Sequence, residues 1–267
     1  MFLTGIRQTE MPRPKDQFPW SMRLFHDLSM LEFSARVTFL VGENGCGKST
    51  LLEGLAVGAR AIAAGSADID QDESLWAAHE FARGFRFARK RRASRTLFVR
   101  AEDVLGYSLR AARLRQEEKM TLEELDQERI RDQTLPRTGS AEYMKERLTR
   151  KYGYDPMARS HGETFLDLLS DRLAPRGLYF LDEPEAPLSP KWILSLLALI
   201  AGRARNDCQF VIATHSPILM ALPEAQILLL EDDQIRVMPY EELDHVKITK
   251  AFLNNPAKFL RHLVGDD

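Results

Sequence analysis

The residues between positions 42 and 49 have the composition and spacing of a phosphate-binding loop. The segment reads Gly42-Glu43-Asn44-Gly45-Cys46-Gly47-Lys48-Ser49, which is the pattern G-x-x-x-x-G-K-S. Glycines allow successive backbone N–H groups to surround phosphate oxygens, and a helix that begins at this point adds positive potential. Lys48 would reach the β- and γ-phosphates, and the Ser49 hydroxyl would bind Mg²⁺. The bland alternative is a glycine-rich turn that binds nothing, and the apolar strand and helix expected beside the loop disfavour it.

Cysteine is scarce in this chain. Cys46 and Cys208 are the only two, which is too few for a disulfide framework, and a reducing cytosol is the default compartment. Cys46 is interpreted as a small residue tolerated within the loop, with a redox switch as the alternative. Cys208 is expected to be a core residue.

Two adjacent acids end an apolar run farther along the chain. The run Gly177-Leu178-Tyr179-Phe180-Leu181 is followed by Asp182 and Glu183. Carboxylates at the end of a buried strand are costly unless a positive group meets them, and Mg²⁺ would be that group. Asp182 would hold the metal, and Glu183 would polarise the water that attacks the γ-phosphate. The alternative is a strand that stops at a polar turn.

A histidine follows the next apolar run, in Ala213-Thr214-His215-Ser216-Pro217. In a doubly wound sheet, ligands bind beyond the carboxyl ends of the strands. His215 is therefore expected on the same rim as the loop and the two acids, where it would sense the γ-phosphate. A histidine that serves only as a structural hydrogen-bond donor is the alternative.

Hydrophobic spacing predicts the elements that position these residues. Residues 1–20 have no clean period and are expected to be irregular. The first half should contain strands at Met22–Leu28, Leu31–Phe33 and Arg36–Val41, then a helix over Ser49–Ala64. The second half should contain helices and strands at Glu163–Leu173, Gly177–Leu181, Pro190–Ala204 and Cys208–Ala213, then a hairpin (Ala225–Leu230 and Gln234–Pro239) and two helices (Tyr240–Leu253 and Pro256–Val264). This alternation predicts an α/β fold with a mostly parallel sheet that helices cover on both faces.

The middle of the chain has its own charge pattern. Of the 267 residues, 44% are hydrophobic and 28% charged, with a formal net charge of -2. The segment Arg83–Arg115 carries eleven Lys and Arg against two acids, a local +9 that leaves -11 for the rest. The segment Glu117–Asp132 carries seven acids and is expected to be a solvated helix. We expect one domain in three parts: residues 1–82, a basic helical insertion at 83–158, and residues 159–267.

The order of these motifs resembles the ABC-type ATPase superfamily. The phosphate loop, Ser160-His161-Gly162-Glu163, LDEPEAPLS and ATHS follow one another as in soluble, stand-alone members related to SMC and RecF-like proteins, which are often named AAA family ATPases. The resemblance implies a P-loop fold with ATP and Mg²⁺ as cofactors. It also implies nucleotide contacts from the whole loop through Thr50, catalytic roles for Lys48, Glu183 and His215, and an ATP-dependent homodimer in which Ser160 and Gly162 contact the ATP of the other subunit.

The sequence departs from the family pattern at three places. The segment Glu185–Ser189 lacks the aspartate usual after the two acids. The glutamine expected after the strand Thr96–Arg100 is absent, with Arg100 or Glu102 aligned there. An adenine-stacking aromatic would be Trp20 or Phe25, for which core packing is the favoured interpretation.

The function that follows is a cytoplasmic, Mg-dependent ATPase whose homodimer acts as a conformational switch. The basic segment could track a nucleic-acid backbone in DNA repair or defence, or contact an acidic protein or the acidic stretch of the same chain. A transporter's ATP-binding subunit and a nucleotide-binding scaffold with little turnover are the alternatives. No direct membrane insertion is expected, because the longest apolar run, Ile193–Ala201, is about half of what a spanning helix needs.

Overall fold

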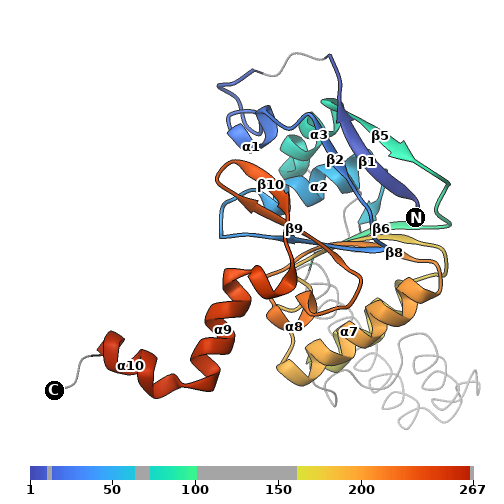
Figure 1. Cartoon of the computed structure of the whole chain (residues 1–267). Coiled ribbons are helices and arrows are strands. Elements are labelled where there is room, and N and C mark those ends of the chain that lie inside the picture. The colour runs from blue at the N-terminus through green and yellow to red at the C-terminus, as the bar shows by residue number, and fades with distance from the viewer. Residues whose placement is uncertain (11–13, 64–72, 101–160, 265–267) are drawn as a thin grey trace, which may run out of the picture.

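The computed structural model describes residues 1–10, 14–63, 73–100 and 161–264 (Figure 1). The expected acidic helix at Glu117–Asp132 lies outside these residues, as do Ser160, Glu102 and the part of the basic segment after Arg100.

A seven-stranded sheet forms the centre of the molecule. Every strand pair in it is parallel except β9–β10, which is the expected hairpin with Asp232 and Asp233 at its turn (φ 49° and 59°). The expectation of a mixed, mostly parallel α/β fold is confirmed. In spatial order the strands are β10 (Gln234–Val237), β9 (Gln226–Glu231), β3 (Val37–Val41), β8 (Gln209–Ala213), β7 (Leu178–Asp182), β6 (Thr96–Arg100) and β4 (Ile62–Ala63).

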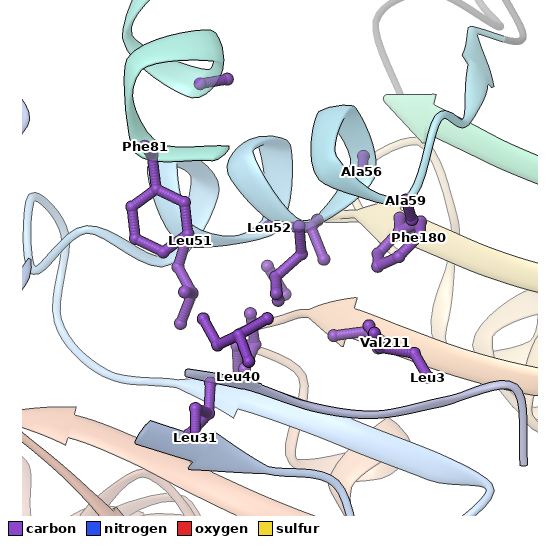
Figure 2. Close-up of a cluster of buried hydrophobic side chains, with 14 of the residues drawn as sticks. Leu3, Leu31, Leu40, Leu51, Leu52, Ala56, Ala59, Phe81, Phe180 and Val211 are labelled. Atoms are coloured by element: carbon purple, nitrogen blue, oxygen red, sulfur yellow. The ribbon is translucent and has the colours of Figure 1, made fainter. Parts of the chain in front are cut away.

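Helices cover both faces of this sheet because its central strands are apolar on both sides. In β7, Leu178 and Phe180 face one core cluster, whereas Tyr179 and Leu181 face the other. The first cluster packs under α2 (Lys48–Gly58) and α3 (Trp76–Arg83), and Figure 2 shows part of it. The second packs against α6 (His161–Arg172), α7 (Pro190–Arg205) and α8 (Pro217–Met220).

A small antiparallel sheet lies beside the first core. It consists of β2 (Met30–Glu32), β1 (Leu3–Gln8) and β5 (Phe85–Arg89) in that order. The prediction of an irregular segment at residues 1–20 is wrong for β1. An irregularity in the pairing of β1 with β5 between Leu3 and Gly5 breaks the two-residue period, which explains why the sequence showed none.

Two further boundaries differ from the prediction. The strand expected at Met22–Leu28 is instead the short helix α1 (Arg23–His26), which buries Leu24 and Phe25. The helix expected over Ser49–Ala64 ends at Gly58, where the N–H of Ala61 bonds the carbonyl of Ala56 and that of Arg60 bonds the carbonyl of Val57. This is the Schellman arrangement, and Arg60 takes its left-handed position (φ 56°).

The segment expected to begin the insertion belongs instead to the two sheets. Residues 85–89 form β5 in the small sheet and residues 96–100 form β6 in the main sheet. The described chain thus contributes strands to both sheets up to Arg100, and the division into three parts stays a prediction. The strand Thr96–Arg100 was expected, whereas the alternation in FRFAR was obscured by its arginines.

The chain ends in helices that leave the body of the molecule. A short 3₁₀ turn, η4 (Tyr240–Glu242), leads to α9 (Asp244–Asn254) and α10 (Pro256–Val264), which extend outward in Figure 1. Among the described residues, no helix combines the length and the apolar character needed to cross a bilayer.

Candidate functional site

The phosphate loop connects the end of β3 to the start of α2. Gly42, Gly45 and Gly47 have φ values of 154°, 82° and 99°. A Cβ on Gly42 would lie 2.4 Å from the carbonyl oxygen of Leu230, so the loop passes too close to β9 for any side chain. Gly47 caps α2 without a side-chain hydrogen bond, which leaves the first N–H groups of the helix available to an anion.

Lys48 and Ser49 face the inside and the edge of this loop. The Lys48 side chain is buried, and its Nζ donates to the carbonyls of Gly42 and Glu43, each at 2.9 Å. An ammonium has three N–H donors, so one remains for a phosphate oxygen. The Ser49 hydroxyl donates to Oδ1 of Asp182 at 3.3 Å, which joins the loop to the end of β7.

Asp182 lies in a carboxylate-rich environment that a cation would stabilise. Burial, the neighbouring Glu53 and, more weakly, Glu183 raise the pKa of Asp182, the hydrogen bond from Ser49 and the charge of Arg100 oppose the rise, and the resulting pKa is about 6. Hard oxygen donors from one carboxylate and one hydroxyl suit Mg²⁺, which keeps waters and phosphate oxygens as its other ligands. Within the described ranges, no group of three His, Cys, Asp or Glu residues forms a metal cluster.

Glu183 and His215 meet at the same rim. The N–H of Glu183 bonds the carbonyl of Ala213 at 2.9 Å, and Glu183 takes a left-handed backbone conformation (φ 43°). Its Oε1 lies 3.7 Å from Nε2 of His215. Burial and then Lys48 lower the pKa of His215, which favours a neutral ring at pH 7. The topology thus places His215 beside the two acids, as the sequence predicted.

Glu185 ties the segment after the two acids to the histidine segment, a role that sequence reasoning missed. Its Oε1 accepts hydrogen bonds from the hydroxyl of Thr214 and from the N–H groups of His215 (2.8 Å) and Ser216 (3.1 Å). Burial raises the pKa of Glu185, and these hydrogen bonds oppose the rise. Glu185 therefore holds the backbone on both sides of His215, and Ser216 in turn caps α8.

His245 is a second residue that sequence reasoning missed. It lies in the first turn of α9, with its ring centroid 5.8 Å from that of His215. Its Nε2 lies 4.0 Å from Oε1 of Glu43 in the phosphate loop. No motif includes this residue, because only the path of the chain after β10 brings it to the rim.

The departures from the family pattern have clear places in the structure. Arg100 ends β6 next to Asp182 and pairs with Glu53 of α2 at 2.6 Å, so an ion pair occupies the position aligned with the missing glutamine. Trp20 and Phe25 are buried against Phe81, which confirms core packing for both.

The remaining predicted residues are less informative. Asn44 and Gly45 are exposed in the loop, Cys46 is half-buried there, and Thr50 lies in α2. Gly162 lies in α6, whereas Ser160 is outside the described residues. Cys208 is fully buried, which confirms the prediction of a core residue.

The opposite edge of the sheet is basic. Parallel strands share one amino-terminal edge, and the residues that precede β3, β6, β7 and β4 there are arginines. The acids of this edge are Asp207, which Arg36 and Arg91 both contact, and Glu224 before β9. We call the following exposed residues the basic edge: Arg36, Arg60, Lys90, Arg91, Arg92, Arg95, Arg176 and Arg205.

A comparison with family models decides the family. A model described as "AAA domain" matches residues 21–155, slightly more than half of the chain. The chain belongs to this family. A second model, described as "AAA domain, putative AbiEii toxin, Type IV TA system", matches residues 164–221 of this AAA-domain chain. The resemblance to P-loop ATPases that the motifs indicated is thereby confirmed at the level of the family.

Solved structures similar to this AAA-domain chain include an SMC head and a transporter component. The SMC head domain from Thermotoga maritima is 17% identical, with 90% of this chain and 99% of that chain covered and a TM-score of 0.44. The cbiO1 protein from Clostridium perfringens, part of the ABC transporter complex cbiONQ, is 16% identical, with 99% of each chain covered and a TM-score of 0.45. The search of curated proteins gave no match.

Proposed function

We propose that this AAA-domain chain binds ATP with Mg²⁺ at the carboxyl rim of its main sheet and hydrolyses it to ADP and phosphate. The observation that carries the proposal is the convergence of Lys48, Ser49, Asp182, Glu183 and His215 on that rim. Loop and α2 N–H groups would hold the phosphates, and Ser49 and Asp182 would hold the metal, which neutralises phosphate charge when bound.

The chain's own residues would then move one proton. The Glu183 carboxylate is half-exposed and would accept the proton of the attacking water. The neutral His215 ring would donate a hydrogen bond to a γ-phosphate oxygen. Its Nε2 is buried and has no hydrogen-bond partner among the described residues, so a ligand oxygen would satisfy it.

We further propose that ATP closes a homodimer, as the motif order implies. Ser160 and Gly162 would contact the ATP of the other subunit, and hydrolysis would reopen the pair.

The variant Glu183→Gln tests both parts of the proposal. Removing the base should lower kcat by about 100-fold or more while ATP still binds. With ATP and Mg²⁺, the variant should elute as a dimer on sizing chromatography with light scattering, and wild type should return to monomer as ATP is consumed.

Two control variants make this result specific. Lys48→Ala should neither bind ATP nor dimerise, whereas Glu32→Gln, the same change at an exposed strand position, should behave as wild type. A Glu183→Gln protein that hydrolyses ATP normally and stays monomeric with ATP contradicts the scheme.

A second proposal concerns the partner: the basic edge binds the phosphate backbone of a nucleic acid. Arg60 and Arg176 support it, because both have left-handed backbones (φ 56° and 57°), where glycine would be less strained by about 1 kcal/mol. Burial and the nearby Arg60 also lower the pKa of Arg89, a sign of accumulated positive charge.

The sequence had assigned this role to the whole segment Arg83–Arg115, and the structure divides it. Arg83 pairs with Glu80, and Arg100 faces the ATP rim with Glu53. Within the described part of the segment, which ends at Arg100, the stretch from Lys90 to Arg95 belongs to the basic edge, where it joins arginines from distant parts of the chain.

A further inference from the structure

The first turn of α9 is fixed to the core on both sides of His245. Leu243 and Val246 are each only 1% exposed and pack in the cluster below the sheet. The N–H of Val246 bonds the carbonyl of Leu243 at 3.1 Å, which closes the turn around His245. The His245 ring is therefore held at the rim by two buried anchors.

The side chain of His245 lies close to two side chains of the proposed ATP site. It lies 4.0 Å from the Glu43 carboxylate and in ring contact with His215. Glu43 also supplies a carbonyl to Lys48, so the same loop residue contacts both Lys48 and His245. A γ-phosphate bound at this site would repel the Glu43 carboxylate and would attract an N–H of the His245 imidazole.

Beyond this turn, α9 is held by few apolar contacts, and its exposed Lys250 pairs with Glu241 and lies over the Tyr240 ring. Val246 is its one buried residue among those described, and Ile248, Phe252 and Leu253 are exposed by 61%, 37% and 69%. Phe252 also packs on Phe259 of α10, which links the two helices. A small change at His245 would thus be carried along a helix of about 16 Å, at 1.5 Å per residue, into α10.

We propose that His245 is a positioning residue that senses the γ-phosphate and transmits its presence to α9 and α10. This inference rests on the proposed function and goes beyond it, because it names the element that reports the nucleotide state. The interaction of His245 with Glu43 would give way to one with the γ-phosphate, and the first turn of α9 would tighten. ADP, which lacks the γ-phosphate, would leave α9 as it is.

Hydrogen–deuterium exchange on the full chain tests the proposal, with ATPγS and ADP each bound in the presence of Mg²⁺. In wild type, exchange in residues 243–250 should be about fivefold to tenfold slower with ATPγS than with ADP, the ratio that one added hydrogen bond of ordinary net strength produces. In His245→Ala this difference should vanish, and the Kd for ATPγS should rise by no more than about tenfold, because the loop contacts are intact and coupling is reciprocal. His245→Gln, which keeps an N–H donor, should restore part of the difference.

Thr249→Ala is the matched control, since it lies one turn later on the same helix and is exposed. It should retain the full difference. A His245→Ala protein that keeps the ATPγS-dependent slowing, or a wild type with equal exchange in both nucleotides, overturns the proposal. Amides of residues 42–49 serve as the internal reference: if ATPγS slows exchange there but not in α9, only this inference fails, and if it slows neither, ATP binding fails as well.

Discussion

At the scale of single residues, Asp182 lies in an environment that disfavours its charged form. Its carboxyl is surrounded by Glu53 and Glu183 and is largely buried, and its pKa rises from 3.8 to about 6. Between these values the folded chain keeps a proton that the unfolded chain has lost. Stability therefore falls as pH rises through this range, by up to about 3 kcal/mol for the single group.

Asp182→Asn should remove this dependence. Without Mg²⁺ and nucleotide, the free energy of unfolding of the variant minus that of wild type should increase by about 2 to 3 kcal/mol between pH 4 and pH 7. Urea titrations at pH 4, 5.5 and 7 measure the difference. Asp233→Asn, at the exposed hairpin turn, provides the control and should show no such trend. A difference between Asp182→Asn and wild type that is independent of pH would contradict the assignment.

The sequence foresaw those site residues that lie in one short segment with a fixed spacing. The loop from Gly42 to Ser49 and the pair Asp182-Glu183 need only a strand before them to be positioned, and both strands are strongly apolar. Glu185 contacts Thr214, and His245 contacts His215. In each pair the two residues are about 30 positions apart along the chain. Such contacts depend on the tertiary path, which local spacing does not encode.

At the scale of elements, the small sheet depends on a buried glutamine for its attachment. Gln209 begins β8, and its Oε1 accepts from the N–H groups of Phe2 (2.6 Å) and Leu3 (3.0 Å), while its Nε2 donates to the carbonyl of Leu3 (2.7 Å). Gln226 makes a corresponding link between β9 and β2, through the carbonyl of Glu32. The side-chain amides of these two glutamines thus link the small sheet to the main sheet, where no strand pairing among the described residues connects them.

Gln209→Leu should destabilise the chain by about 2 to 4 kcal/mol, because two N–H groups and one carbonyl would be buried without partners. The same change at the exposed Gln234 in β10 should cost less than about 0.5 kcal/mol. Chemical denaturation measures both. If Gln209→Leu were as stable as Gln234→Leu, the amide would not be what attaches β1.

Element prediction from the sequence succeeded where both faces of a strand are buried and failed at the small sheet. The runs in β3, β7 and β8 are continuously apolar, so helix and strand could be distinguished by length and alternation with helices. The segment of β5 reads FRFAR with three exposed residues, and that of β1 is interrupted at Gly5. Neither can be recognised without its partner strand.

At the scale of the whole molecule, the main sheet separates two charged surfaces at its two edges. The carboxyl edge gathers Asp182, Glu183 and Glu185 with the phosphate loop, and the amino edge carries eight exposed Lys and Arg residues. A formal net charge of -2 conceals this division. The strand direction could have predicted half of these residues, since Arg36, Arg60, Arg95 and Arg176 each lie one or two residues before a parallel strand.

If the amino edge holds a nucleic-acid backbone, removing charges there should weaken binding without affecting ATP hydrolysis. Lys90, Arg92 and Arg176 suit the test, because none of them pairs with a carboxylate among the described residues. Changing all three to Ala should lower the affinity for double-stranded DNA. It should also reduce the slope of log K against log salt by about 0.9 for each phosphate that is no longer neutralised. The basal ATPase rate of the triple variant should equal that of wild type, which separates this prediction from that of the rim.

Lys247→Ala, Lys250→Ala and Lys258→Ala combined remove the same charge from α9 and α10 and should leave both the affinity and the slope unchanged. Fluorescence anisotropy with labelled duplex DNA and RNA between about 50 and 200 mM salt, together with sedimentation on anionic vesicles, completes the comparison. Equal decreases in affinity for the two triple variants would mean that the protein responds only to its net charge. Retention on vesicles but not on nucleic acid would assign the edge to a membrane surface instead. The arginines of this edge come from four separate strand ends, so they form one row only when the sheet is folded. Urea-unfolded protein should therefore show no difference between the two variants.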